Sequence, residues 1–142
     1  MEAEQKLKSQ SELLELLVQT SSSYINISEE DLKHTIQASL KKLGEFVEAD
    51  RMYVFDYDWA QNTCTNTFEW CAPGIEPQLE LLQETSLDGL EDWTEQHLKG
   101  EMMYVEDIDL LEESATLRQI LEPQGIKSLL SMPVMDQNKC IG

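Results

Sequence analysis

The hydrophobic period of this sequence changes at Ala49, and this change constrains the fold more than any other feature. Residues 28–48 follow a helical spacing, whereas Met52–Tyr57 is dominated by strand-forming side chains. Such a run without a regular polar face is typical of an interior strand that is covered on both sides. Residues 58–62 read as a loop and residues 63–71 as a second strand, so the segment predicts a β-hairpin.

The register of this hairpin decides which side chains share a face. If the loop centres on Ala60, antiparallel pairing places Arg51 opposite Glu69, a charge pair across the strands. Side chains alternate along the second strand. One face then carries Thr65, Thr67, Glu69 and Cys71, and the other carries Asn66, Phe68 and Trp70. One set packs under helices and the other lines a pocket, and the sequence leaves open which set does which.

Two helices are predicted before the hairpin. Ser28 begins a sequence that resembles a capping box, and apolar residues then recur at helical spacing through residue 48. Residues 3–20 have helix-forming composition and read as an amphipathic helix. The leucines at heptad-like spacing on it are Leu7, Leu14 and Leu17. We interpret residues 1–24 as a linker or dimerisation helix with these leucines at its seam.

The second half of the chain predicts shorter elements. In order they are helices at 76–84 and 87–99, a strand at 101–105, a helix at 114–122, a strand at 126–135 and the start of a strand at 140. Helices and strands in this order indicate an α+β fold with an antiparallel sheet.

Composition narrows the function classes. The 142 residues fit one domain, and their net charge of −18 disfavours nucleic acid and anionic membrane surfaces as partners. No apolar run is long enough to span a membrane, and the charged N-terminus shows no signal peptide. Three cysteines without C-x-x-C spacing fit a reduced, cytoplasmic protein.

Several motifs together resemble a known family. They are Ala49-Asp50-Arg51 at the first strand, Glu69-Trp70-Cys71-Ala72 at the end of the second, Gly74-Ile75-x-Pro77-Gln78 after it, and Gly125-Ile126-x-Ser128 leading to Pro133-Val134, with Ile141-Gly142 beginning a last strand. Together they resemble a GAF domain of the kind found in bacterial sensor histidine kinases and GGDEF/EAL-type signalling proteins. The resemblance runs from about residue 10 to the end.

The resemblance implies a GAF-like, PAS-related fold over residues 25–142. In such a fold N-terminal helices cover one face of a central antiparallel sheet, and short helices and loops cover a small-molecule pocket on the other. It also implies a final strand that this sequence only begins, a homodimer, and an output domain linked to the same chain. The pocket-lining residues expected here are Tyr53, Phe55, Trp70, Ile75, Trp93 and Ser128.

The titratable side chains give no catalytic constellation. A cysteine-dependent reductase with the GAF fold is the third hypothesis, but the spacing of Cys64, Cys71 and Cys140 does not resemble that family, and buried core cysteines are the favoured interpretation. His34 faces water, while His97 shares a stripe with Trp93 and reads as a buried, hydrogen-bonded residue in preference to a haem ligand.

Cofactor signals are equally weak. The helix at 114–122 contains neither the cysteine nor the histidine expected for bilin attachment, and the cyclic-nucleotide signature of GAF domains is not visible. The pairs Asp56/Asp58 and Asp107/Asp109 read as caps and solvated loops and not as a metal site. The cofactor therefore stays unknown. The leading hypothesis is a non-catalytic sensory module with an unidentified small-molecule ligand, and the alternative is a ligand-free dimerisation module.

Overall fold

The computed structural model describes residues 2–142. In chain order the elements are α1 (Glu2–Ser22), α2 (Glu29–Phe46), β1 (Arg51–Asp58), β2 (Thr63–Cys71), β3 (Thr85–Ser86), α3 (Glu91–Leu98), β4 (Met103–Val105), the 3-10 helix η1 (Ile108–Leu110), α4 (Thr116–Leu121), the 3-10 helix η2 (Glu122–Gln124), β5 (Leu129–Ser131), β6 (Met135–Asp136) and β7 (Lys139–Cys140). The predicted α+β class with antiparallel pairing is confirmed.

The chain divides into two compact units. The first contains the residues up to Tyr53 together with Phe68–Pro77, and the second contains Val54–Thr67 together with Gln78–Gly142. The β1–β2 hairpin therefore contributes residues to both units.

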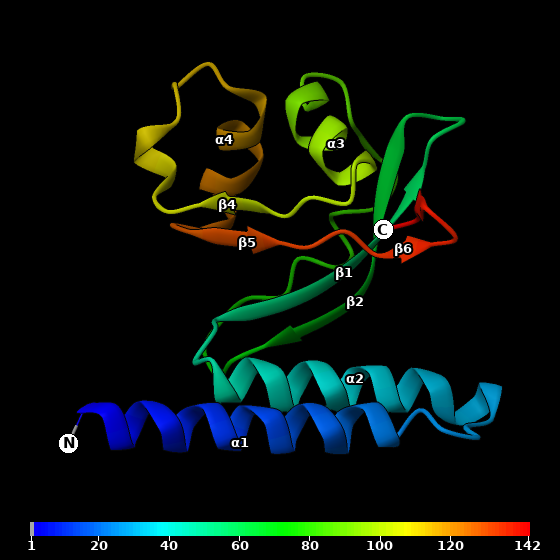
Figure 1. Ribbon diagram of the computed structural model, residues 1–142. Coiled ribbons are helices and arrows are strands. Elements are labelled where there is room, and N and C mark those ends of the chain that lie inside the picture. Colours follow the sequence, from blue (N-terminus) through cyan, green and yellow to red (C-terminus); the bar gives the residue numbers. More distant parts are fainter. Residues whose placement is uncertain (1) are drawn as a thin grey trace. The chain divides into compact units, whose positions relative to one another are not determined.

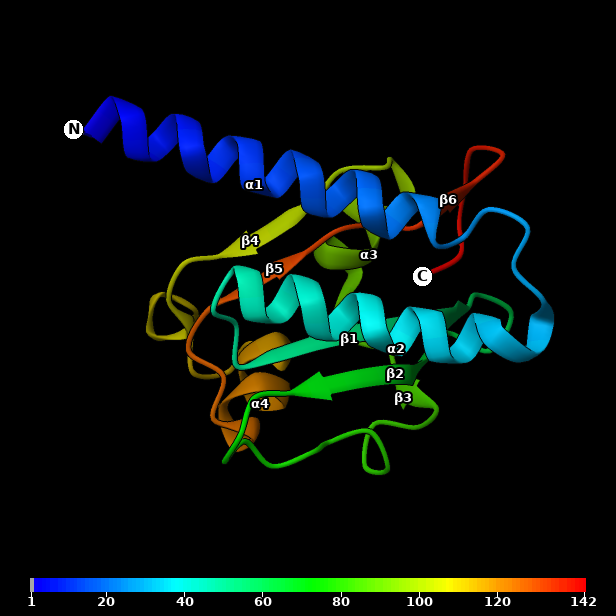
Figure 2. The same ribbon diagram turned by 90° about the horizontal axis from the view of Figure 1, so that it is seen from below.

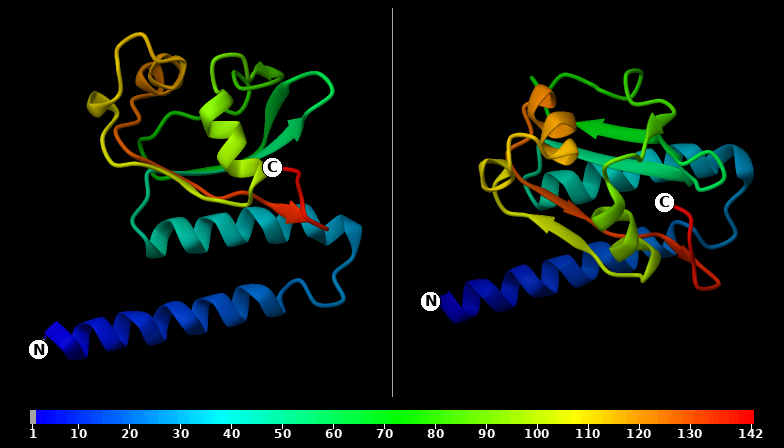
Figure 3. Two further views of the ribbon diagram at one scale, coloured as in Figure 1. Left: turned by 45° about the horizontal axis from the view of Figure 1, so that its top comes forward. Right: turned by 90° about the horizontal axis from the view of Figure 1, so that it is seen from above.

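In the first unit, α1 and α2 run antiparallel and are joined by a short loop (Figure 3). Ser28 caps α2, because its hydroxyl oxygen accepts a hydrogen bond from the Asp31 N–H at 3.3 Å and its O–H donates to the Asp31 carboxylate at 2.9 Å. The predicted helix start at Ser28 is confirmed. No helix within residues 2–142 has the length and apolar character needed to cross a membrane.

A close approach between α2 and β2 shapes the same unit. Gly44 is buried on α2, and a Cβ atom added to it would overlap the ring of Trp70 and touch the Met52 side chain. Only glycine allows the helix backbone to lie this near an indole ring. The Gln37 side chain adds a hydrogen bond to the Glu69 carbonyl at 2.7 Å.

The register of the β1–β2 hairpin differs from the one predicted. The Ala72 N–H donates to the Asp50 carbonyl at 2.8 Å, so Arg51 lies opposite Cys71 and not Glu69. The predicted pairing is wrong by two residues because the loop does not centre on Ala60. An even shift leaves every side chain on its predicted face of the strand, since the side-chain period is two.

In the second unit, β2 pairs antiparallel with the short edge strand β3 (Figure 2). The β4–β5 pair aligns Met103 with Ser131 and Val105 with Leu129, and α3 and α4 lie on one side of it (Figure 1). A hydrophobic core forms around three buried side chains. These are Val105, Ile108 and Leu121, packed against Trp93, Leu111, Leu117, Ile126 and Leu129.

Two predicted helices are corrected. Residues 76–84 form turns because the edge of β2 binds their backbone: the Asn66 N–H donates to the Leu82 carbonyl at 2.8 Å, and the Glu84 N–H donates to the Thr65 hydroxyl at 3.0 Å. The predicted helix at 87–99 begins only at Glu91, after Gly89 adopts a positive φ of 87°.

The predicted strand at 126–135 is also shorter in the structure. It is reduced to β5 and the first residues of the β6–β7 hairpin. The Ile126–Ser128 stretch is not a strand; there the Lys127 carbonyl instead accepts the Ile108 N–H at 2.8 Å, which ties this stretch to η1.

The Gly44 contact makes a direct prediction about stability. Gly44→Ala adds a methyl group against Trp70, and overpacking of this kind costs about 1–3 kcal/mol, whereas the gain in helix propensity is only about 1 kcal/mol. We expect a net loss in the free energy of unfolding, measured by urea denaturation. Lys41→Ala, on the exposed face of α2, is the control. Equal or higher stability of Gly44→Ala would contradict the close packing.

Candidate functional site

Arg51 organises the polar end of the hairpin in the first unit. Its guanidinium donates to the Tyr53 hydroxyl at 3.4 Å and to the Glu76 carbonyl at 2.6 Å. Burial and the negative charge of Glu69 raise the pKa of the Cys71 thiol, although Arg51 acts in the opposite direction. Burial likewise raises the pKa of Tyr53. Burial thus favours the neutral forms of Cys71 and Tyr53 beside the charged Arg51 and Glu69, and the cluster does not activate a nucleophile.

His97 is one of the two most deeply buried titratable groups of the second unit; like Cys140, it has 2% of its surface exposed. Its Nδ1 lies 2.6 Å from the Tyr57 hydroxyl, and its Nε2 lies 3.0 Å from the Ser131 hydroxyl. The Trp93 ring packs edge-on against the imidazole, with ring centroids 5.2 Å apart. We call these four residues, Trp93, Tyr57, His97 and Ser131, the His97 chain. The expectation of a buried, hydrogen-bonded His97 is confirmed.

Both ring nitrogens of His97 are paired with hydroxyl groups. In the neutral imidazole one nitrogen donates and the other accepts. The Tyr57 and Ser131 hydroxyls can each donate or accept, so they satisfy both nitrogens in either tautomer. Burial raises the pKa of Tyr57 to about 12 and lowers the pKa of His97. Both groups are thus held neutral, which suits a structural hydrogen-bond network better than acid–base catalysis.

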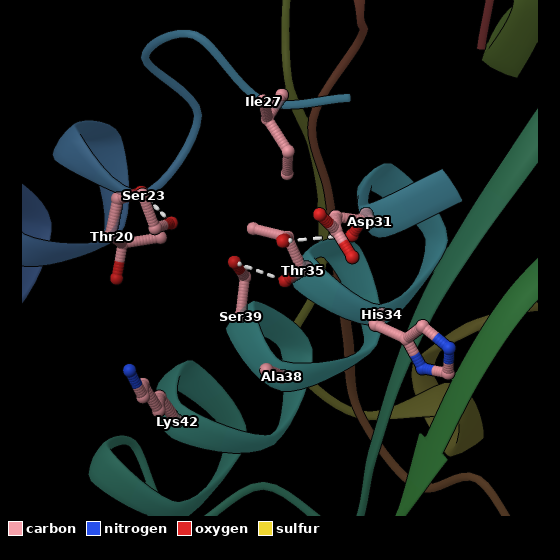
Figure 4. Close-up of a pocket in the computed structure, with 9 residues that line it drawn as sticks. All are labelled: Thr20, Ser23, Ile27, Asp31, His34, Thr35, Ala38, Ser39 and Lys42. Carbon is pink, nitrogen blue, oxygen red and sulfur yellow. Dashed lines mark hydrogen bonds between the residues drawn. The ribbon is translucent and has the colours of Figure 1, made fainter. Parts of the chain in front are cut away.

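A pocket of about 490 Å³ lies between α1 and α2 in the first unit (Figure 4). Four of its nine lining residues carry hydroxyl groups. The Ser39 hydroxyl donates to the Thr35 carbonyl and bonds the Tyr24 hydroxyl, both at 2.8 Å, while the buried Thr20 hydroxyl has no partner within the described residues. The lining residues are Thr20, Ser23, Ile27, Asp31, His34, Thr35, Ala38, Ser39 and Lys42. A cleft of this size is large enough for a small molecule.

Asn66 is a buried polar residue that the sequence analysis did not single out as a candidate site residue. Its side chain is 1% exposed, and neither amide atom has a hydrogen-bond partner among residues 2–142. Its backbone is well paired, since its carbonyl accepts the Gln83 side chain at 2.9 Å. A buried amide without a partner costs about 1–3 kcal/mol. The alternation along β2 placed Asn66 on the same face as Phe68 and Trp70 but did not indicate that its amide would lack a partner.

The residues predicted to line a pocket lie in different places. Tyr53 and half-buried Ile75 belong to the first unit, where Tyr53 bonds Arg51. Trp70 packs on Gly44 of α2. In the second unit, Trp93 belongs to the His97 chain, Phe55 is half-buried on β1 and Ser128 is exposed. None of the six lines the α1–α2 pocket.

Part of the His97 chain carried a signal in the sequence. Tyr57 follows Tyr53 and Phe55 at the strand period of two, and His97 follows Trp93 by one helical turn, so their faces could be predicted. The meeting of Tyr57, His97 and Ser131 could not, because they are separated by tens of residues on three different elements. Among residues 2–142, no three histidine, cysteine or acidic side chains converge as a metal site.

The comparisons with known proteins agree with this architecture. The family model of the GAF domain matches residues 31–142, so the chain belongs to the GAF domain family. Part of a curated relative, the "Methanogenesis regulatory histidine kinase FilI" of Methanothrix harundinacea (strain 6Ac), is 29% identical over 131 residues. The match covers 89% of this chain but 15% of that relative.

Solved structures share the fold at low sequence identity. The photoproduct state of GAF3 from Slr1393 of Synechocystis sp. PCC6803 has a TM-score of 0.65 at 17% identity, covering 78% of this chain and 72% of that one. A domain of a putative two-component sensor histidine kinase from Sinorhizobium meliloti 1021 has a TM-score of 0.54 at 19% identity, covering 82% and 70%. These likenesses establish the GAF fold.

The buried imidazole predicts a dependence of stability on pH. The pKa of His97 lies below its ordinary value of 6.5, so the unfolded chain binds the proton first as the pH falls. The stabilising contribution is complete above pH 6.5 and declines below it, toward the lower pKa of the folded state. We expect the free energy of unfolding, measured by urea titration from about pH 8 to 5, to fall more in the natural protein than in His97→Gln.

His34→Gln is the matched control, because His34 is the other histidine of the chain and is exposed on α2. It should keep the pH dependence of the natural protein. An identical pH profile for His97→Gln and the natural protein would show that the imidazole is not held neutral by the fold.

Proposed function

We propose that this chain is a non-catalytic sensory module that binds a small molecule and relays binding to an output domain of a signalling protein. The observation that carries the proposal is the α1–α2 pocket, whose volume of about 490 Å³ falls within the range of about 300–1,000 Å³ typical of ligand sites. Membership of the GAF family and the histidine kinase relative support the same function.

The position of the pocket suggests how binding is relayed. Thr20 and Ser23 come from α1 and its end, whereas Thr35, Ser39 and Lys42 come from α2. No residue of α1 is buried, so few contacts hold this helix in place. A molecule that bridges the two helices binds better at one spacing than at another, and that difference in affinity shifts the position of α1.

The thiols support a non-catalytic module. Burial raises the pKa of Cys64, Cys71 and Cys140, so each favours the neutral thiol, which is a poor nucleophile. The cysteine-dependent reductase therefore remains the weakest of the three hypotheses. It would require turnover of free methionine sulfoxide that is lost in Cys71→Ser or Cys140→Ser.

Ligand binding is tested by native mass spectrometry of the purified protein, followed by thermal-shift measurements with a panel of small polar metabolites. We expect a mass excess that disappears on denaturation, or a rise in melting temperature with at least one compound. Ala38→Met projects a larger side chain into the pocket and should abolish either signal. Lys41→Met, outside the pocket on the same helix, should keep it. A ligand bound equally by both variants would place the site elsewhere, and no ligand for any variant would contradict a sensor.

A dimerisation module is the second candidate, because α1 exposes an apolar stripe. Leu7, Leu14 and Leu17 are 70%, 64% and 42% exposed, and Val18 beside them is 64% exposed. Exposed apolar side chains in a row on one helix face are typical of a helix–helix interface. The two candidate functions are compatible, since a ligand that repositions α1 would also reposition its partner.

Light scattering after size-exclusion chromatography tests the dimer. We expect the natural protein to elute with twice the chain mass and the double variant Leu14→Glu/Leu17→Glu to elute with the mass of one chain, because carboxylates at an apolar seam are costly to bury. Gln10→Glu, exposed on the same helix, controls for added charge. An unchanged mass for the double variant would exclude this seam.

A further inference from the structure

We propose that His97 couples α3 to the C-terminal hairpin, so that displacement of α3 releases the hairpin from β1. By C-terminal hairpin we mean residues 135–142, which contain β6 and β7. All the groups involved belong to the second unit. The proposal adds to the sensory function a specific route along which a change at α3 reaches this end of the chain.

Two hydrogen bonds hold the hairpin to β1 and to the loop that follows it. The Tyr57 N–H donates to the Ile141 carbonyl at 2.9 Å. The Trp59 indole N–H donates to the Cys140 carbonyl at 2.7 Å. The Trp59 ring stacks on the Tyr57 ring with centroids 4.4 Å apart. Tyr57 and Trp59 are therefore the two residues of β1 and the following loop on which the hairpin rests.

Tyr57 is also the residue through which β1 contacts α3. Its hydroxyl lies 2.6 Å from His97 Nδ1, and its ring meets the imidazole edge-on at a centroid distance of 5.9 Å. The backbone of Tyr57 thus binds the hairpin while its side chain binds α3. A shift of the Tyr57 side chain that follows α3 must also move its backbone or the stacked Trp59 ring.

The contacts close into a ring. His97 Nε2 lies 3.0 Å from the Ser131 hydroxyl, three residues before Val134. Val134 donates its N–H to the Gly142 carbonyl at 2.8 Å and accepts the Ile141 N–H at 2.9 Å. From Ile141 the ring returns through Tyr57 to His97 Nδ1. His97 is therefore linked to the hairpin by two routes, through Ser131 ahead of its first strand and through Tyr57, whose N–H binds Ile141.

The arrangement has two states that differ by a few discrete bonds. With His97 in place, both ring nitrogens are paired and the hairpin is bound to β1. If α3 moves, a buried imidazole would lose one or both partners, which is costly in a site this protected from water. Tyr57 then moves with His97, and this movement breaks the contacts that hold the hairpin, because Tyr57 also binds Ile141 and stacks on Trp59.

Fluorine NMR of protein labelled with 5-fluorotryptophan measures the coupling. The chain has three tryptophans: Trp93 reports on α3, Trp59 on the hairpin, and Trp70 on the first unit. We expect His97→Gln to shift the Trp93 and Trp59 resonances and to leave Trp70 unchanged. Lys41→Gln, exposed on α2 and outside the α1–α2 pocket, should shift none of the three. A shift of Trp93 alone would overturn the proposal, because α3 would then move without the hairpin.

Amide hydrogen exchange distinguishes coupling from a general loss of stability. We expect the Tyr57 amide, which binds the hairpin, to exchange at least about tenfold faster in His97→Gln, with a smaller change at Val105 in the β4–β5 pair. Equal acceleration at both amides would make His97 a general stabiliser and overturn the proposal. If His97→Gln does not fold, Ser131→Ala keeps the imidazole and should give the same pattern with smaller changes. No change at Tyr57 in Ser131→Ala would contradict the ring.

Discussion

The second unit depends on the pairing of a buried imidazole. A histidine that is removed from water must have partners for both ring nitrogens, because an unpaired polar atom in the interior is costly. The partners of His97 are Tyr57 on β1 and Ser131 on β5. The two hydrogen bonds of the His97 side chain on α3 therefore fix the positions of β1 and β5, which are far apart in the sequence. The stacked Trp59 and the bonds to residues 140 and 141 extend this order to the end of the chain.

The first unit is held together by a different kind of contact. Gly44 brings α2 against the Trp70 ring, and this packing depends on shape and not on charge. The Arg51 guanidinium organises the polar end of the hairpin through Tyr53 and the Glu76 carbonyl. By contrast, α1 contributes no buried residue. Its leucines are exposed and a pocket lies beside it, which is why the proposed response to a ligand or to a second chain is assigned to α1.

Membership of the GAF family defines the fold but leaves the ligand open. The same fold carries many chemistries, because the side chains at the site and not the backbone determine what binds. In this chain burial favours the neutral forms of the three thiols and of His97. Two further features of its side chains are the hydroxyl groups between α1 and α2 and the amide of Asn66, which has no hydrogen-bond partner among residues 2–142.

The sequence by itself determined the elements whose cause is local. The cap at Ser28, the face of α2, the β1–β2 hairpin and the burial of His97 follow from hydrogen bonding and periodicity within short segments. The tertiary structure decided what depends on distant partners. Residues 76–84 form turns and not the predicted helix, because residues at the edge of β2 form hydrogen bonds with their backbone. The packing of Trp70 on Gly44 and the hydrogen bond between Tyr57 and His97 depend on tertiary structure, which joins residues that no local pattern connects.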